Sequence, residues 1–352
     1  MSVVMKECAL PEVSQAVQHN CHIADALYAG DYTLCIYLLK MREFYRWEQG
    51  LPYNSLLENQ SVGEWLRERE QLWNDLENNE FETVVIDDHE FDPFATEAIN
   101  KALKPYDLVY SGGLGLKSKP HFFLGKLHNR DELNGYSVYI SSNEYARDLT
   151  APPAMALGQT IFIRRESLKR MLWEKLEEWR WNKPANAMAR AIKHYDFQND
   201  VDAALDTMTE NELHSALLHE IGEVEAGQWL GEDWEKMLAE LPRSKAEIML
   251  RALRDHLADA LSTLPSLVEQ EKAASLHFYF ANLNAMRKHM YPALLSAYRH
   301  WYEDNNIKPL NKQIKQGREH WQSLAENALE LYRQQGPESR ESIESLLENA
   351  IL

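Results

Sequence analysis

Nearly all of the runs that have the character of β-strands in this chain fall in one segment, between about residues 81 and 163. They are short and rich in aromatic and β-branched residues, as in HFFLGKL from His121 and YSVYIS from Tyr136, a composition that favours strands. Asn134-Gly135 stands directly before YSVYIS and is a strong two-residue turn signal. We therefore expect these two runs to pair as a hairpin with a somewhat extended connection.

On both sides of this segment the apolar residues recur at the spacing of helices. The sequence therefore predicts a mainly α protein, in which both ends of the chain form one helical body and a small α+β segment is inserted between them. The expected divisions are residues 1–80 for the N-terminal helices, 81–165 for the α+β segment and 166–352 for the C-terminal helical region. The C-terminal region is expected to be one compact unit with residues 1–80.

The excess of acidic over basic residues limits the kinds of molecule that the protein is expected to bind. The chain has 37 Lys plus Arg against 55 Asp plus Glu, a formal net charge of -18, which repels a phosphate backbone, so nucleic acid is not an expected partner. No apolar run approaches the roughly 20 residues that cross a bilayer, and no basic stretch precedes an apolar one at the N-terminus, so no membrane association is expected. The three cysteines form no CxxC pair and are interpreted as reduced thiols. These features predict a soluble, cytoplasmic protein.

The side chains best suited to chemistry lie in a helix predicted around residues 212–229, ELHSALLHEIGEVEAGQW. His219 and Glu223 are four residues apart, and Glu220 and Glu223 are three apart, so one helical turn presents an imidazole and two carboxylates. These are ligand types that bind Fe, Mn or Zn. Apolar neighbours would bury part of the turn, and a buried carboxylate requires a cation, which could be a metal ion or an arginine.

A second segment, RALRDHLADALSTL at residues 251–264, places His256 and Asp259 three residues apart on another helix with an apolar face. Two such helices packed antiparallel could surround one divalent metal ion, as helix bundles do. The predicted ligands are His219, Glu223, His256 and Asp259, with Glu220 as a ligand or general base. The two imidazoles make Zn, Mn or Fe a better fit than Mg. In the alternative interpretation, these carboxylates form ordinary ion pairs on helix surfaces.

Local motifs in these two segments resemble those of known enzymes. HEIGE at His219–Glu223 and HLAD at His256–Asp259 resemble the EExxE and ExxD halves of the all-α nucleoside-triphosphate pyrophosphatases. In that family carboxylates hold Mg²⁺ against a triphosphate, and His219 and His256 stand where it has glutamates. LLHEIG at Leu217–Gly222 resembles the LLHDIG signature of HD-domain phosphohydrolases, with Glu220 in place of the aspartate.

A third resemblance covers more of the chain and is to an uncharacterised bacterial family with no known activity. It is carried by NCHIADALYAGDYTLCIYLLKMREFYRWEQGLP at Asn20–Pro52, by YSGGLGLKSKPHFFLGKL and by LLHEIGE. The resemblance implies one architecture over the whole chain and leaves the function open.

Two further segments hold candidate residues. Cys21, His22 and Glu43 lie in the N-terminal helices and could contribute to the same metal centre; alternatively Cys21 is a small core residue and Glu43 forms a surface ion pair. The stretch Ser111–Gly115, followed by Lys117 and Lys119, could wrap its backbone N–H groups around an anion. A simple flexible turn is the alternative for that stretch.

These observations favour a metal-dependent enzyme, and the first hypothesis is a hydrolase of a phosphorylated small molecule or nucleotide. A bound metal would polarise a phosphoryl oxygen and lower the pKa of a bound water. A non-haem di-iron oxidase is one alternative, and it needs about six ligands. The other is a non-enzymatic interaction protein, whose acidic helical surface docks a protein partner and whose polar cluster is structural.

Overall fold

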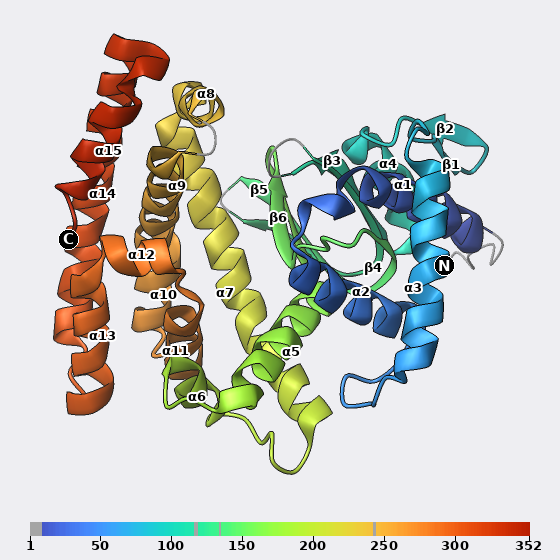
Figure 1. Cartoon of the computed structure of the whole chain (residues 1–352), viewed down its shortest axis with the longest axis horizontal. Coiled ribbons are helices and arrows are strands. Elements are labelled where there is room, and N and C mark those ends of the chain that lie inside the picture. Colours follow the sequence, from blue (N-terminus) through green and yellow to red (C-terminus); the bar gives the residue numbers. More distant parts are fainter. Residues whose placement is uncertain (1–8, 116–118, 134, 242–243) are drawn as a thin grey trace. The chain divides into compact units, whose positions relative to one another are not determined.

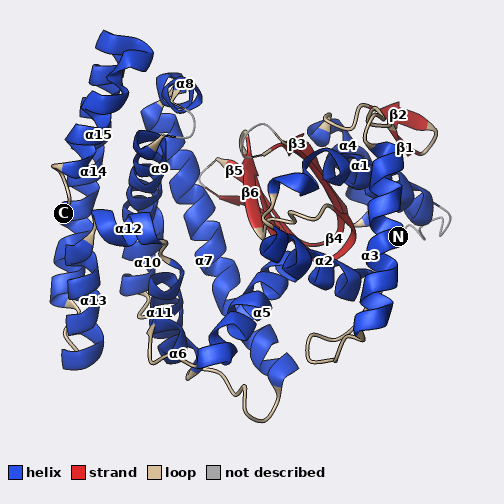
Figure 2. Ribbon diagram, viewed as in Figure 1, coloured by secondary structure: helices blue, strands red, loops and turns tan. Residues whose placement is uncertain are grey.

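The computed structural model describes residues 9–115, 119–133, 135–241 and 244–352 (Figure 1). The chain divides into two compact units. The first runs to residue 177 and includes residues 198–209, and the second consists of residues 178–197 and 210–352. The described strands all belong to the first unit (Figure 2).

The first unit is built on a five-stranded mixed sheet with the strand order β3-β4-β5-β7-β6. Only β5 and β7 pair in parallel, and the other neighbouring strands of this sheet are antiparallel. A separate two-stranded sheet pairs β1 with β2. The strands are β1 (Val84–Ile86), β2 (His89–Phe91), β3 (Leu108–Leu114), β4 (Pro120–Leu133), β5 (Tyr136–Arg147), β6 (Ala154–Leu157) and β7 (Thr160–Arg164).

The helices that belong wholly to the first unit are α1 (Ala9–Tyr28), α2 (Leu34–Glu48), α3 (Asn59–Leu76) and α4 (Thr96–Leu103), with short 3-10 turns at Ala29–Asp31 and Lys104–Tyr106. α1 and α4 pack on strands of this sheet, and α3 packs against α1 and α2. The apolar side of α1 buries Val13, Val17 and Cys21 in one core with Phe122 and Leu124 of β4. α1 and α4 therefore lie beside the strands in Figure 2.

The predicted hairpin of β4 and β5 is confirmed. The two strands pair antiparallel, and Leu133 lies opposite Tyr136. Gly135 has φ +86°, a left-handed conformation that glycine adopts without strain, while Asn134 lies outside the described residues. The expected extended connection is wrong, because β4 continues past Leu127 to Leu133.

The prediction of a mainly α protein with a small α+β insert is wrong. The five-stranded sheet organises a whole unit, and residues 9–80 belong to that unit, whereas residues 210–352 belong to the other. The expected single body formed by both ends of the chain is therefore not observed. Helical periodicity identifies the buried face of a helix such as α1, but that face can pack on a sheet as well as on other helices.

The regular secondary structure in the described residues of the second unit is helical. Its core includes the fully buried side chains of Trp234, Leu253 and Trp321. Ser244 caps the N-terminus of α9 by accepting a hydrogen bond from the backbone N–H of Glu247. The helices are α6 (Ala187–Ile192), α8 (Glu232–Glu240), α9 (Lys245–Ala258), α10 (Leu264–Glu269), α11 (Ala273–Asn282), α12 (Ala285–Met290), α13 (Pro292–Asp304), α14 (Lys308–Gln335) and α15 (Arg340–Glu348), with a 3-10 turn at Gly336–Ser339.

Two long helices contribute residues to both units, α5 (Arg165–Asn182) and α7 (Val201–Leu230). Among the described helices, none is both long enough and apolar enough to cross a membrane.

The helix that begins as α9 continues past Pro265. A π-helical turn, η4 (Asp259–Thr263), joins α9 directly to α10. Proline removes a backbone donor and its ring clashes with the carbonyl four residues earlier, and a wider π turn accommodates both. Asp259 is the first residue of this turn, so the backbone irregularity lies at a predicted site residue.

Candidate functional site

The site predicted in the second unit depends on a close approach between α7 and the end of α9. Gly222 of α7 lies against the backbone of Ala258: a Cβ atom at position 222 would be 2.9 Å from the carbonyl carbon of Ala258 and 3.2 Å from Cβ of Ser262. Only glycine allows the two helices to come this close. The glycine of the HEIGE motif therefore has a packing role, and it brings the helix face that carries His219 next to Asp259.

A buried ionic cluster forms where the two helices meet. The Nδ1 atom of His219 lies 3.0 Å from Oδ1 of Asp259, and Nη2 of Arg287 donates a hydrogen bond to Oδ2 of the same carboxylate. Nη2 of Arg287 also donates to the hydroxyl oxygen of Tyr279 at 2.9 Å. The side chain of Asp259 is 1% exposed, whereas that of His219 is 40% exposed. The cluster is thus a buried carboxylate between an arginine and a partly exposed imidazole.

The electrostatics of the cluster make His219 a cation. Burial opposes its protonation, but the hydrogen bond and the negative charge of Asp259, with a further contribution from Glu223, raise the pKa of His219 to about 9. Burial alone would raise the pKa of Asp259, but Arg287 and His219 outweigh it and hold that pKa well below its usual range. A protonated imidazole has no free lone pair for a metal, so metal binding here would first require loss of the proton.

The other predicted residues of this site lie close by but have different roles. Glu223 pairs with Arg254, with 3.0 Å between Oε2 and Nη2, and its pKa is raised mainly by burial. Glu220 is half-buried on α7 and lies near enough to add to the upward shift of the His219 pKa.

His256 is directed into the core, although it is only three residues from Asp259. Its Nε2 atom lies 3.0 Å from the backbone oxygen of Arg287, and its ring stacks on Trp321 with 5.0 Å between centroids. Burial, and then the positive charge of Arg287, lower the pKa of His256 to about 3, so the ring is neutral. The structure therefore brings His219, Glu223 and Asp259 together, and His256 stabilises the core.

Of the two cations that the sequence allowed for the buried carboxylates, a metal ion or an arginine, the structure shows arginine beside Asp259 and Glu223. Across the described residues, no group of three or more His, Cys, Asp or Glu side chains is arranged to hold a metal ion. Arg287 neutralises Asp259 and Arg254 neutralises Glu223. Nothing in the sequence marks Arg287, 28 residues after Asp259, as the partner of that carboxylate. Metal binding by His219, Glu223, His256 and Asp259 stays a prediction.

The candidates in the N-terminal helices belong to the first unit and are held by neighbours there. Cys21 is buried, and its thiol donates to the backbone oxygen of Phe122 at 3.3 Å. His22 lies with Nε2 2.6 Å from Nη1 of Arg69, and burial, followed by the charge of Arg69, lowers its pKa to about 3. The carboxylate of Glu43 is paired with Arg46 at 3.0 Å.

The candidate anion loop is not a loop in its described part. Residues 111–114 belong to β3, so neither the anion-binding loop nor the flexible turn is observed there. A Cβ at Gly112 would lie 2.9 Å from the ring of Phe122, which shows that this glycine serves close packing. Lys119 pairs with Asp31, and Lys117 lies outside the described residues.

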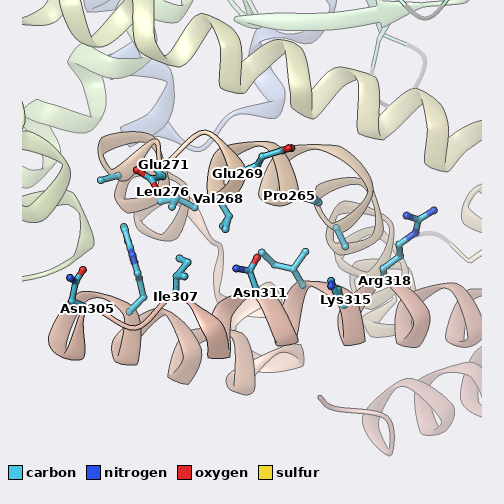
Figure 3. Close-up of a pocket in the computed structure, with 14 residues that line it drawn as sticks. Pro265, Val268, Glu269, Glu271, Leu276, Asn305, Ile307, Asn311, Lys315 and Arg318 are labelled. Carbon is cyan, nitrogen blue, oxygen red and sulfur yellow. The ribbon is translucent and has the colours of Figure 1, made fainter.

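A cavity of about 910 Å³ lies in the second unit, between the segment η4–α11 and the facing helices α13 and α14. Its apolar lining includes Ala260, Val268, Leu276, Trp301, Ile307 and Ile314. Lys315 and Arg318 stand side by side on α14 at one end, and Glu269 and Glu271 lie on the facing segment (Figure 3). No pattern in the sequence predicted this cavity, because its walls come from segments that only tertiary packing brings together.

These observations define a class of two-unit proteins. The first unit is α+β with a mixed five-stranded sheet, and the second is helical with a buried ionic cluster. Two family models match the chain: residues 12–164 match the N-terminal domain, and residues 169–350 the C-terminal domain, of a family of unknown function (DUF6866). The chain belongs to this family. The comparisons with curated proteins and with solved structures gave no match. None of these findings supports the local resemblances to pyrophosphatases or HD-domain enzymes.

Proposed function

We propose that the second unit binds a small molecule that has an apolar body and one negatively charged group, in the cavity between η4–α11 and α13–α14. The observation that carries the proposal is an apolar cavity with a pair of cationic side chains, Lys315 and Arg318, at one end. The volume of about 910 Å³ falls within the range of roughly 300–1,000 Å³ that is typical of ligand pockets.

The positive charge of the cavity lies on α14, although the whole chain is acidic. The charged residues of the lining are Glu269, Glu271, Lys315 and Arg318, so the lining carries no net charge in a chain whose net charge is -18, and both of its cations lie on α14. Lys315 and Arg318 are three residues apart, on one face of α14. No ion pair involves either of them among the described residues. Both are therefore available to a ligand carboxylate or phosphate.

The acidic residues of the cavity give the ligand an orientation. Glu269 and Glu271 lie across the cavity from α14, and like charges repel an anionic group that is placed near them. The ligand anion is therefore directed to Lys315 and Arg318, and its apolar body covers side chains such as Ile314. Hydrogen bonds to charged groups contribute about 1.5–3 kcal/mol each, which corresponds to roughly a tenfold to hundredfold change in affinity.

Three probes with the same ten-carbon chain and different head groups test this assignment: decanoate, decanol and decylamine. Titration calorimetry with the full chain is expected to show that decanoate binds more tightly than decanol, and that decylamine binds least. Replacing both Lys315 and Arg318 with glutamine should weaken decanoate at least tenfold and leave decanol nearly unchanged. Lys312→Gln is the matched control, because Lys312 is an exposed lysine of the same helix that does not line the cavity.

Equal binding of decanoate and decanol by the wild-type protein would refute the proposal. So would an equal loss of decanoate affinity in the control and in the double variant, because the effect would then reflect the overall charge of α14. The proposal assigns no reaction to the cavity. Metal-dependent hydrolysis and di-iron oxidation both depend on a metal centre at His219 and Asp259, and they stay predictions.

A further inference from the structure

A second cavity, of about 690 Å³, lies within the first unit and has a different chemical character. It is formed by α1, α2, α3, β5 and the beginning of α5. Most of its lining side chains form hydrogen bonds or carry charge: Ser14, Gln15, Gln18, His19, His22, Glu48, Asn143, Glu144 and Glu166. Such a cavity suits a polar ligand and provides little surface for an apolar one.

Carboxylates in and around this cavity are generally paired with an arginine. Glu144 receives two hydrogen bonds from Arg164, at 2.9 and 2.8 Å, and Glu48 pairs with Arg69. These ion pairs satisfy the buried negative charges, as burial requires.

Glu166 is the exception. Its Oε2 atom accepts a hydrogen bond from the backbone N–H of Glu144 at 2.6 Å. Within the described part of the chain, no lysine or arginine forms an ion pair with this carboxylate. Glu166 is only half-buried and lines the cavity. Its second oxygen therefore remains available to whatever enters.

The surroundings favour the neutral form of this carboxyl group. Burial, and then the nearby charge of Glu144, raise the pKa of Glu166, while the N–H of Glu144 and the charges of Arg147 and Arg164 lower it by a smaller amount. A carboxyl group that is protonated for lack of a partner becomes ionised when a cation binds beside it.

We propose that this cavity binds the ammonium group of a small amine, with the Glu166 carboxylate as its counter-ion. The ammonium group donates one hydrogen bond to the free oxygen of Glu166, and the side-chain oxygens of Asn143 and Gln15, which also line the cavity, are acceptors for its other protons. The ligand thus supplies to Glu166 the positive charge and hydrogen bond that Arg164 supplies to Glu144. This site and the anion-binding cavity belong to different units, and either proposal can fail without the other.

Binding by this route is linked to a proton. At a pH where Glu166 is largely protonated, entry of an alkylammonium ion ionises the carboxyl group and releases up to one proton. Affinity therefore rises as the pH increases through the raised pKa of Glu166. His19 and His22 of α1, Glu48 of α2, Glu144 and Arg147 of β5 and Arg164 of β7 also face or adjoin this group, so the pH dependence must be assigned by substitution.

Titration calorimetry of the full chain with butylammonium chloride tests the proposal, with butanol as the neutral probe of the same length. Measurements near pH 6 in two buffers of different ionisation enthalpy report the number of protons released. We expect butylammonium to bind at least tenfold more tightly than butanol, with release of a fraction of a proton that falls as the pH rises. The Glu166→Gln variant keeps the acceptor for the N–H of Glu144 and removes the charge, so both the binding and the proton release should be lost.

Glu68→Gln, an exposed glutamate of α3 outside the cavity, should bind as the wild type does. A His19→Gln variant that keeps the pH dependence assigns the proton to Glu166. The proposal is overturned if butanol and butylammonium bind equally, if Glu166→Gln binds as the wild type does, or if the pH dependence disappears in His19→Gln. The measurements on wild-type protein decide the matter even if a variant does not fold.

Discussion

Replacing Gly222 with alanine tests the close approach of α7 to the π-helical turn, on which the contact between His219 and Asp259 depends. The new methyl group would be 2.9 Å from the carbonyl carbon of Ala258 and 3.2 Å from Cβ of Ser262. The first of these atoms belongs to the backbone and cannot rotate away. Overpacking of this kind costs about 1–3 kcal/mol, and the better helix propensity of alanine returns about 1 kcal/mol. We expect a net loss of up to about 2 kcal/mol.

Gly227→Ala provides a matched control in the same helix. Its Cβ would meet only Nη2 of Arg254, at 3.9 Å, so the substitution should stabilise the protein by about 0.5–1 kcal/mol through helix propensity alone. Urea denaturation measures both changes in stability. Hydrogen exchange of the α7 amides shows whether the second unit is the part affected. A shift of the His219 pKa toward its ordinary value should accompany the loss in Gly222→Ala. If Gly222→Ala proves as stable as Gly227→Ala, the close approach of the two helices is wrong.

Four further outcomes follow from the ionic cluster and from the burial of His256 beside it. Arg287→Met leaves the Asp259 carboxylate buried without its arginine and should lower the free energy of unfolding by about 3–5 kcal/mol. Adding Asp259→Asn should recover much of this loss. A loss under about 0.5 kcal/mol in Arg287→Met would contradict the pairing. The pKa of His219 is raised to about 9, so its stabilisation is complete below pH 6.5 and is lost as the pH rises through about 9. Because this side chain is 40% exposed, we expect its stabilisation to be about 1 kcal/mol at most. Urea denaturation should show this as a difference in stability between the wild type and His219→Gln that disappears at high pH. The pKa of His256 is lowered to about 3, so stability should fall as the pH drops below 6.5, and an NMR titration that finds this ring protonated at pH 5 would contradict its burial. Metal analysis of untagged protein tests the predicted metal site against the ion pairs: one equivalent of Zn, Mn or Fe that is lost in His219→Ala would support the metal site, whereas no stoichiometric metal would contradict it and leave Arg287 as the counter-ion of Asp259.

The sequence determined the features that arise from local spacing. Helical periodicity located α7 and α9, and the turn residues at Asn134-Gly135 indicated the hairpin of β4 and β5. The spacing of His219 and Glu223 placed both on one turn of α7, and Asp259 lies opposite them as the pattern suggested. These predictions succeed because a helix or a hairpin is specified by residues within a few positions of one another.

Only the tertiary structure decided which groups meet across the fold. Asp259 required a cation, and the sequence could not tell a metal ion from Arg287, because the arginine comes from α12 and reaches the carboxylate only through packing. His256 shares a helix with Asp259 but stacks on Trp321, because α14 packs against α9 and brings this ring to the side of the helix that carries His256. Likewise, the apolar face of α1 showed that it would be buried, but not that a sheet would cover it. Periodicity predicts that a side chain is buried. The residue that it packs against depends on how segments distant in the sequence come together in three dimensions.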